Sequence, residues 1–556
     1  MPEITFIPDG LNSTIPVGAT LLEAARSAGI VIESPCDGVG TCGKCKVRVL
    51  AGAETLETSD DRHKLSEEER AEGFVLACSS TVFGDMTVEV ESTEGHNKTL
   101  KILSEGASFA YELEPFITKR FEGGQTTIYA GDEPLGVEEG DTTDKLYGLA
   151  IDIGTTTVVT ALIDMLTGEE LDSVSALNPQ SLHAQDVLTR IKFASTPEGL
   201  REMHESVTAQ FRSMTDDLCA RAGVDKRFIY ETVYSGNTTM IHLATNVNPA
   251  TLGKFPYIPQ IFGGNHIPAA EYGLDIAPFG LIYLPPIITA FVGPDITSGV
   301  LAARLHERRG TTLFVDIGTN GEMIIARDGT LSATSTAAGP AFEGMNITSG
   351  MRAGTGAIEY FSIAEDGSIE LRTIGATKPV GICGSGLFDI VGELARVGVI
   401  GKNGRIVPAN RGTYPEMLKE RVVELNGKPA FCVADEVFIT QGDIRQVQLA
   451  KGAVRSGVEA MMTSVGVSEA EVGAVQIAGS FGYHLRADSL VNIALIPAAL
   501  GDRIEFVGNT SKSGAQAFLL NTPCRAEMEE VTAQVNSVEL SNQEGFDKLF
   551  VACLGF

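Results

Sequence analysis

The alternation of apolar and polar positions predicts a small α+β domain at the start of the chain. Residues 4 to 17 alternate around the turn signal Asp9-Gly10, which is typical of a β-hairpin. The capping box TLLE at residues 20–23 then predicts a short helix that ends at Gly29. A loop rich in glycine and cysteine follows, and after it the segments KVRVLAG and MTVEVES predict two strands. We therefore expect one domain over residues 1–94.

A different pattern begins after a weakly periodic stretch. Residues 95–145 contain EGGQ, GDEP and EEGDTTD, so we expect a linker with room for a small structured element. Beyond it, strand-like and helix-like segments alternate over residues 146–556, as in an α/β architecture. Within this part LAIDIGTT, which begins at Leu149, recurs as LFVDIGTN, which begins at Leu313. The repeat predicts two related halves, which we divide near residue 310.

Composition and charge narrow the classes of partner. The 556 residues are too many for one compact core, and 43% apolar with 21% charged residues is ordinary for a globular protein. The net charge of −30 argues against nucleic acid or an anionic membrane as a partner. The longest apolar stretch, residues 279–292, is interrupted by two prolines and is too short to span a bilayer. The N-terminus MPEITFIPDG lacks the features of a signal peptide, so we expect a cytoplasmic protein.

Four of the nine cysteines form a pattern that points to metal. Cys36, Cys42 and Cys45 are spaced C-x5-C-x2-C, and Cys78 lies further along in FVLACSS. A 2Fe-2S cluster needs four thiolates, two for each iron, and the intervening glycines leave backbone N–H groups free to hydrogen-bond sulfur. A four-cysteine zinc site is the alternative, although such sites usually consist of two C-x2-C pairs. The other five cysteines are expected to be buried and inert: Cys219, Cys383, Cys432, Cys524 and Cys553.

The repeated DIGT motif has the chemistry of a phosphate site. In the first copy an apolar strand leads through Asp152 and a tight turn directly into a second apolar strand. Gly154 allows close approach of a phosphate, Thr155 and Thr156 offer N–H and hydroxyl donors, and Asp152 can hold Mg²⁺ directly or through water. The second copy repeats these groups as Asp316, Gly318, Thr319 and Asn320.

Two hairpins of this kind, facing each other, would hold a polyphosphate and its metal from both sides. A single D-x-G-T is often only a structural turn, so the second copy carries the argument. A third segment, VGAVQIAGSFG, ends an apolar strand at Gly479-Ser480. It resembles the adenosine motif of the actin-like ATPase superfamily, and the alternative is an ordinary strand-to-helix turn. No Walker A motif or Rossmann fingerprint is present.

The chain also resembles a known family along most of its length. CDGVGTCGKC with the later LAC is similar to 2Fe-2S ferredoxins of the β-grasp fold. NPQSLHAQDVLTRI, SGNTTMIHL, LGKFPY, FVGPDI, AGPAFEG, GICGSGL and DIRQVQLAKGAVRSGVEA resemble the ATPase part of the reductive activators of corrinoid enzymes. The resemblance implies a multidomain α/β protein with a β-grasp ferredoxin followed by a duplicated RNase H-like, actin-type ATPase domain. Lys451, in the last of these segments, would contact either the nucleotide or solvent.

The resemblance also implies a function. The chain would use ATP and Mg²⁺ to pass one electron through a 2Fe-2S cluster and return the Co(II) of a corrinoid protein to Co(I). Its electron donor would be a low-potential ferredoxin or flavodoxin, and the chain would form a homodimer. Asp152 and Asp316 would position Mg²⁺ and phosphates. Two other functions remain open: a small-molecule kinase with a redox-sensing ferredoxin module, and an electron carrier whose docking is gated by nucleotide.

Overall fold

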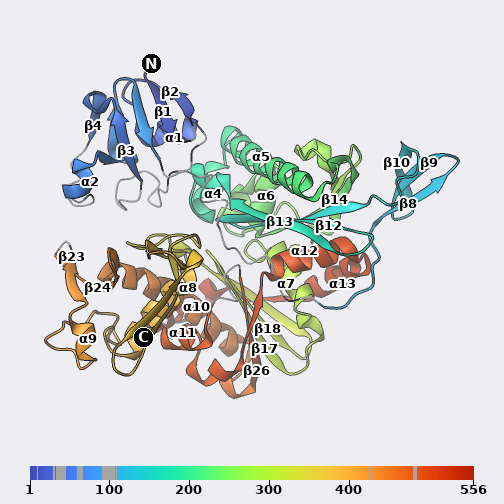
Figure 1. The fold of residues 1–556 in the computed structure, drawn as a ribbon. Helices are drawn as coiled ribbons and strands as arrows, with labels where there is room; N and C mark the ends of the chain where they lie inside the picture. Colours follow the sequence, from blue (N-terminus) through green and yellow to red (C-terminus); the bar gives the residue numbers. More distant parts are fainter. Residues whose placement is uncertain are drawn as a thin grey trace. The chain divides into compact units, whose positions relative to one another are not determined.

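The computed structural model of the chain separates into two compact units, one in residues 1–100 and the other in most of residues 101–556 (Figure 1). The residues that the structure describes are 1–8, 10–28, 30, 32, 45–58, 65, 67–90, 107, 109–425, 427–479 and 485–556.

The first unit is built on a mixed five-stranded sheet. Its strands are β1 (Glu3–Ile7), β2 (Leu11–Thr14), β3 (Lys46–Ala51), β5 (Phe74–Leu76) and β7 (Met86–Glu89), in the order β2-β1-β7-β3-β5. β1 pairs with β2 as the expected antiparallel hairpin and with β7 in parallel. A smaller sheet joins β4 (Leu56–Thr58) to β6 (Ser80–Val82), and α2 spans Glu67–Ala71.

The expected helix packs on this sheet. α1 (Leu21–Ser27) begins after the N-cap residue Thr20, and the Thr20–Glu23 capping box is confirmed because each side chain bonds the other's backbone N–H. Leu21 and Ala25 of α1 are buried against Phe6 of β1 in one apolar core. A sheet with one helix packed on it agrees with the β-grasp expectation.

The stretch expected to be a linker with room for a small structured element contains a sheet of its own. β8 (Ile117–Glu122), β9 (Gln125–Ala130) and β10 (Glu133–Glu139) make a three-stranded antiparallel sheet at the start of the second unit. Its two turns are Gly123-Gly124, both with positive φ, and Gly131-Asp132. These are hairpin turn residues, so the glycines of EGGQ and GDEP end strands rather than loosen the chain.

The rest of the second unit contains two similar sheets. The first consists of β11 (Tyr147–Ile153), β12 (Thr157–Asp164), β13 (Glu170–Leu177), β14 (Ile229–Gly236), β15 (Asn265–Pro268) and β16 (Leu281–Leu284), in the order β13-β12-β11-β14-β16-β15. The second consists of β17 (Thr311–Ile317), β18 (Gly321–Arg327), β19 (Thr330–Thr336), β26 (Val472–Ala478), β27 (Ile504–Gly508) and β28 (Asn536–Ser537), in the order β27-β26-β17-β18-β19-β28.

The two sheets confirm the duplication that the DIGT repeat predicts. β11 lies between antiparallel β12 and parallel β14, and β17 lies between antiparallel β18 and parallel β26. Each DIGT motif therefore ends the central strand of its own half. The expected arrangement of a duplicated, actin-like domain is confirmed.

Helices join the two halves of this domain. α7 (Pro294–Ala302) and α12 (Thr510–Leu520) cross so closely that a Cβ at Gly514 would lie 2.1 Å from the Ser298 carbonyl oxygen. One buried core includes Ala150 of the first sheet, Phe314 of the second and Ala515 of α12. The two DIGT hairpins are thus attached to a common, tightly packed support.

The remaining elements surround these layers. The helices are α4 (Val187–Phe193), α5 (Pro197–Ala222), α6 (Thr238–Ala244), α8 (Gly384–Arg396), α9 (Glu416–Lys419), α10 (Gln441–Val465), α11 (Ala487–Asn492), α13 (Pro523–Thr532) and α14 (Phe546–Ala552). The strands are β20 (Ala357–Ile363), β21 (Ile369–Thr373), β22 (Gly381–Ile382), β23 (Val422–Leu425), β24 (Lys428–Ala434) and β25 (Val437–Thr440).

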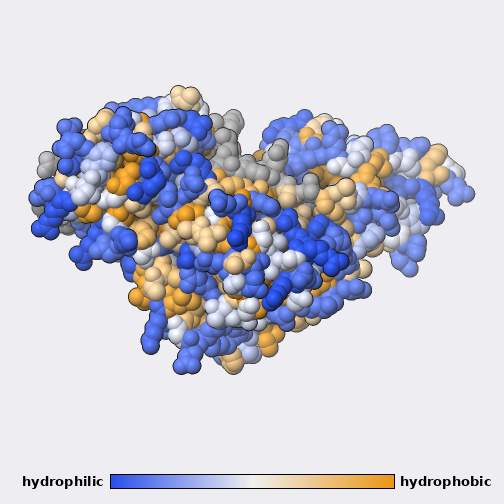
Figure 2. Space-filling view, turned by 90° about the horizontal axis from the view of Figure 1, so that it is seen from below, coloured by the Kyte–Doolittle hydropathy of each residue, from blue (hydrophilic) through white to orange (hydrophobic). Residues whose placement is uncertain are grey.

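One face of the molecule can be judged from its hydropathy. Figure 2 shows hydrophilic residues over much of the visible face, with hydrophobic residues in smaller groups between them. In the described part of the chain, no helix combines the length and the apolar character that crossing a bilayer requires.

Candidate nucleotide site and cysteine pair

The first DIGT motif forms the tight turn between β11 and β12. The last pair of the ladder joins Ile153 to Val158, and the Gly154 N–H donates to the Thr157 carbonyl oxygen at 3.0 Å. A Cβ at position 154 would lie 2.5 Å from that same oxygen. Glycine is therefore required by the turn itself, whatever the turn binds.

The second DIGT motif forms a turn that is one residue shorter. Ile317 pairs directly with Gly321, and the Gly318 N–H donates to the Asn320 carbonyl oxygen at 2.9 Å. This register sets Asp316 opposite Glu322 on β18. Directly opposed residues of an antiparallel pair lie on the same face, so the two carboxyl groups are neighbours.

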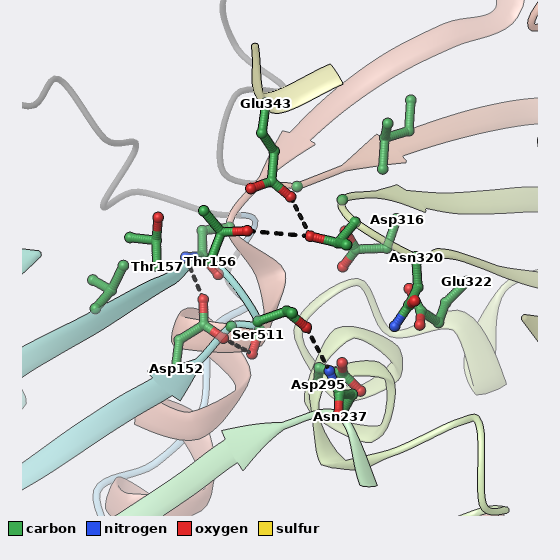
Figure 3. Close-up of a pocket in the computed structure, with 18 residues that line it drawn as sticks. Asp152, Thr156, Thr157, Asn237, Asp295, Asp316, Asn320, Glu322, Glu343 and Ser511 are labelled. Carbon is green, nitrogen blue, oxygen red and sulfur yellow. Dashed lines mark hydrogen bonds between the residues drawn. The ribbon is translucent and has the colours of Figure 1, made fainter. Parts of the chain in front are cut away.

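The two hairpins meet at one cavity of about 120 Å³ (Figure 3). The Thr156 and Thr319 hydroxyl oxygens lie 3.3 Å apart, and the Thr319 hydroxyl donates to the Glu343 carboxylate. The lining residues are Asp152, Gly154, Thr155, Thr156, Thr157, Val159, Asn237, Asp295, Asp316, Ile317, Gly318, Thr319, Asn320, Glu322, Glu343, Gly479, Asn509 and Ser511. Eight of the residues that we singled out in the hairpins are thereby brought together, although their roles stay predictions.

Asp152 is fixed by residues that sequence analysis missed. The Asn509 side-chain amide and the Ser511 hydroxyl donate to its two carboxylate oxygens at 2.8 and 2.7 Å. Asn509 is also the N-cap of α12, where its side-chain oxygen accepts from the Lys512 N–H at 2.9 Å. One cap residue therefore orients both the helix and the carboxylate.

A second asparagine supports the same hairpin. Asn237 is the N-cap of α6, and its side-chain amide donates to the Thr155 hydroxyl at 3.2 Å. Both asparagines lie in the tripeptide Gly-Asn-Thr, at residues 236–238 and again at 508–510, which joins the last residue of a strand to the first residue of a helix. This repeat was a signal in the sequence that could have identified them.

The cavity is rich in carboxyl groups and poor in positive charge. Asp295, in the first turn of α7, and Glu322 line it together with Asp152, Asp316 and Glu343, and none of the described lining residues is lysine, arginine or histidine. The predicted hairpin register could have revealed Glu322. Asp295 lies in FVGPDI, one of the segments that resemble the family's ATPase part, but locally it looks like an ordinary helix start, with an acidic residue after proline.

Burial and mutual repulsion raise the pKa values of these carboxyl groups. Burial, followed by the charges of Asp295 and Asp152, raises the pKa of Asp316 to about 8. Burial is also the largest cause for Asp295, whose pKa rises to about 7, and it raises the pKa of Glu322 well above its usual range. Burial raises the pKa of Asp152 too, while the bonds from Ser511 and Asn509 lower it. A bound cation would relieve this repulsion.

The arrangement fits a cation that keeps part of its water. Among the described residues, no three of the cavity's carboxylates bring oxygens within 4.8 Å of one another. Mg²⁺ is usually held by one or two carboxylates together with waters and substrate phosphates. The donor set therefore fits Mg²⁺ that arrives with a polyphosphate.

The segment predicted to bind adenosine reaches the same cavity through Gly479. Gly479 follows β26 with φ of 122°, and a Cβ there would lie 2.5 Å from the Ile317 carbonyl oxygen of the second hairpin. The close approach explains glycine at this position. Ser480, the other residue predicted in this motif, lies outside the described residues.

Lys451 is not exposed to solvent, and it is not among the residues that line the cavity. It lies in α10, is fully buried, and donates from Nζ to the Gly555 carbonyl oxygen, away from the residues that line the cavity. Burial lowers the pKa of its ammonium group to about 8. The residue is packed beneath the segment around Gly555, which a helical pattern could not reveal.

Two of the four predicted cluster ligands lie side by side in the first unit. The Cys45 and Cys78 sulfur atoms are 3.2 Å apart. Two adjacent cysteine sulfur atoms suit a pair of ligands to one iron. Cys36 and Cys42 lie outside the described residues. Of the other five cysteines, four are buried as expected, and Cys432 is partly exposed.

Family models match almost the whole chain. A model described as the 2Fe-2S iron-sulfur cluster binding domain matches residues 6–83. The RACo middle region matches residues 147–308, and the C-terminal domain of RACo, the ASKHA domain, matches residues 310–556.

Whole-length relatives agree with these models. The corrinoid activation enzyme RamQ of Eubacterium limosum is 30% identical over 95% of this chain and 95% of its own length. This chain belongs to the corrinoid activator family.

Other relatives of this corrinoid activator are consistent with that membership. The [Co(II) methylated amine-specific corrinoid protein] reductase of Methanosarcina barkeri is 24% identical over 74% of the chain and 77% of its own length. A solved structure, the reductive activator for corrinoid, iron-sulfur protein, has 32% sequence identity and a TM-score of 0.74, covering all of this chain and 98% of its own. The family model for the 2Fe-2S domain favours the iron-sulfur reading of the cysteines over zinc.

Proposed function

We propose that this corrinoid activator uses MgATP to reduce a corrinoid protein from Co(II) to Co(I) by one electron. The observation that carries the proposal is the pair of DIGT hairpins that face one carboxyl-lined cavity, on a chain whose first domain carries a pair of adjacent thiols. A redox module and a phosphate site on one polypeptide allow nucleotide energy to drive an unfavourable reduction.

Different residues of the cavity bind the phosphates and the Mg²⁺ of MgATP. Thr155, Thr156, Thr319 and Asn320 supply N–H and side-chain donors to the phosphates, and the turns at Gly154 and Gly318 admit close approach. Asp152 and Asp316, whose carboxyl groups both line the cavity, hold Mg²⁺ directly or through water. When bound, Mg²⁺ neutralises charge on the phosphates.

The adenosine end of the nucleotide is assigned to the third motif. Gly479 lines the cavity beside the second hairpin, and no side chain at this position fills the space next to Asp316. Gly479 and Ser480 are therefore assigned to the ribose and base. ATP is hydrolysed to ADP and phosphate, and the difference in affinity between nucleotide states makes electron delivery effectively irreversible.

Cys36, Cys42, Cys45 and Cys78 are assigned as the four ligands of a 2Fe-2S cluster. When bound, the cluster accepts and releases one electron at a time. Cys45 is fully buried and Cys78 partly exposed, so the protein shields one thiolate of this pair and leaves the other near solvent. The electron donor is assigned as a low-potential ferredoxin or flavodoxin in the cytoplasm. A homodimer is assigned as the state in solution, which light scattering tests directly.

The proposal is tested by steady-state reduction of a Co(II) corrinoid protein, followed by absorbance. The wild-type chain with a low-potential reductant should produce Co(I) only when MgATP is present. Cys78→Ser should remove the iron-sulfur absorption and the reduction, while ATP binding persists. A wild-type chain that hydrolyses ATP only with a sugar or carboxylate, or reduces cobalt equally well without nucleotide, would rule the proposal out.

A further inference from the structure

An exposed apolar surface lies on the first half of the ATPase domain. The apolar patch, as we call it, consists of Leu188, Phe255, Tyr257, Ile258, Phe262 and Phe291. Phe255, Phe262 and Leu188 are 75%, 66% and 65% exposed, which is unusual for large apolar side chains in a folded domain. Exposed aromatic groups of this kind mark protein interaction sites.

The patch is supported by packing rather than being a loose loop. Tyr257 contacts the Phe255 ring at a centroid distance of 6.0 Å and the Phe291 ring at 5.2 Å. Beneath it, Ile191 and Leu252 form a small buried core against which Tyr257 packs. A preformed surface loses little conformational freedom on binding, so it suits a specific partner.

The two segments that carry most of the patch differ in charge from the chain as a whole. Residues 187–193 and 253–264 contain Lys192 and Lys254 at the surface and no acidic residue, while Asp186 directly precedes the first segment and the Glu529 carboxylate lies beside Gly264. The whole chain has a net charge of −30. An acidic partner would be repelled by most of this surface and attracted here.

Two elements connect the patch to the nucleotide cavity. Helix α4 presents Leu188 to solvent, and Arg190 of the same helix donates to the Thr155 carbonyl oxygen of the first hairpin at 2.7 Å. The second connection is the turn at Thr289, whose carbonyl oxygen accepts from the Thr238 hydroxyl at 2.7 Å. That turn carries Phe291 and continues into α7, where Asp295 lines the cavity.

We propose that the apolar patch is the docking surface for the corrinoid protein, and that α4 and the turn at Thr289 couple docking to nucleotide binding. The proposal rests on the proposed function, because that function supplies the protein partner. The patch selects a corrinoid protein whose contact surface has an apolar centre and an acidic rim. Docking that shifts α4 or α7 changes the first hairpin or the carboxyl cluster, so partner and nucleotide each alter the affinity of the other.

The double variant Phe255→Ala/Phe262→Ala tests docking. Both side chains are exposed, so the melting temperature and the basal ATPase rate should stay unchanged. The affinity for a Co(II) corrinoid protein that the wild-type chain reduces, measured by calorimetry, should fall about tenfold or more. Met417→Ala/Val551→Ala, which truncates two exposed apolar residues elsewhere, is the matched control and should bind within about twofold of wild type.

The outcomes separate this proposal from the proposed function. A double variant that binds like wild type would overturn the docking assignment, while a wild-type chain that neither binds nor reduces any corrinoid protein would overturn the function itself. Light scattering compares the oligomeric state of the double variant with that of wild type. If the wild-type chain is a dimer and the double variant is a monomer with unchanged affinity for the corrinoid protein, the patch joins two copies of this chain and the docking assignment is wrong. Lys254→Glu should weaken binding at low salt more than at high salt.

Coupling is tested through Arg190. In the wild-type chain, saturating corrinoid protein should change the affinity for ATP by about fivefold or more. Arg190→Lys removes the planar donor that holds the Thr155 carbonyl oxygen, so partner affinity without nucleotide should persist and the change in ATP affinity should shrink. A full change in ATP affinity in this variant would overturn the coupling through α4.

Discussion

The two DIGT hairpins have the same local sequence but different surroundings. The carboxylate of Asp152 accepts bonds from Asn509 and Ser511, whereas the Asp316 carboxylate has no such donor among the described residues. The shorter second turn also sets Glu322 opposite Asp316, where the first hairpin has Val159 opposite Asp152. The protein therefore fixes the orientation of the Asp152 carboxylate by hydrogen bonds, whereas the Asp316 carboxylate needs a bound cation to stabilise its charge.

The largest expected effect is loss of activity in both aspartate variants. Asp152→Asn and Asp316→Asn should each reduce MgATP-dependent Co(II) reduction by about 100-fold or more, because each removes a negative ligand from the Mg²⁺ site. Stopped-flow absorbance measures the rate. Activity near wild type in either variant would remove that aspartate from the site.

The same two variants should differ in stability, because the two aspartates have different hydrogen-bond partners. Asp152→Asn places an N–H donor next to the donors of Asn509 and Ser511, where the wild-type chain has an acceptor. We therefore expect the free energy of unfolding to fall by about 1–3 kcal/mol. Asp316→Asn removes buried repulsion, so we expect equal or greater stability at pH 8 without metal. Urea unfolding followed by circular dichroism checks both. Equal destabilisation in the two variants would show that Asp316 has donors of its own.

The pH dependence of stability sharpens this comparison. The pKa of Asp316 is about 8 in the folded chain and about 4 when unfolded, so proton binding stabilises the fold at low pH. In metal-free protein that contribution is fully present below about pH 4 and is lost as pH rises through about 8. Asp152, Asp295 and Glu322 face the same cavity and add to the trend.

Mg²⁺ should oppose this loss of stability. Deprotonated carboxylates bind the cation, so the apparent affinity for MgATP should rise between about pH 6 and pH 8.5. Thermal melts at several pH values, with and without MgATP, measure both effects. An unchanged MgATP affinity across this range would contradict the assignment of these carboxyl groups.

A smaller effect is expected from the group that orients Asp152. Ser511→Ala removes one of its two donors but leaves Asn509, so activity should fall about tenfold with little change in the affinity for ATP. Thr510→Ala, one residue away and outside the cavity lining, is the control. If both variants behave alike, the loss reflects α12 in general rather than the Ser511 bond.

The parts that sequence predicted are those fixed by local chemistry. The capping box at Thr20, the two DIGT turns and the central strands follow from turn residues and apolar runs within a few positions of each other. The donors to Asp152 lie more than 350 residues away in sequence, so only the tertiary fold brings them there. The glycines at 123 and 124 could not show whether residues 95–145 were open linker or the small structured element, because a linker and a hairpin turn use the same residue.

A single-turnover experiment tests the central claim most directly. The chain is first reduced, freed of excess reductant, and then mixed with a Co(II) corrinoid protein with and without MgATP while absorbance is recorded. We predict that Co(I) appears with MgATP, at no more than one equivalent per chain, and that almost none appears without it. Equal amounts of Co(I) in both arms would contradict the coupling of nucleotide to electron transfer.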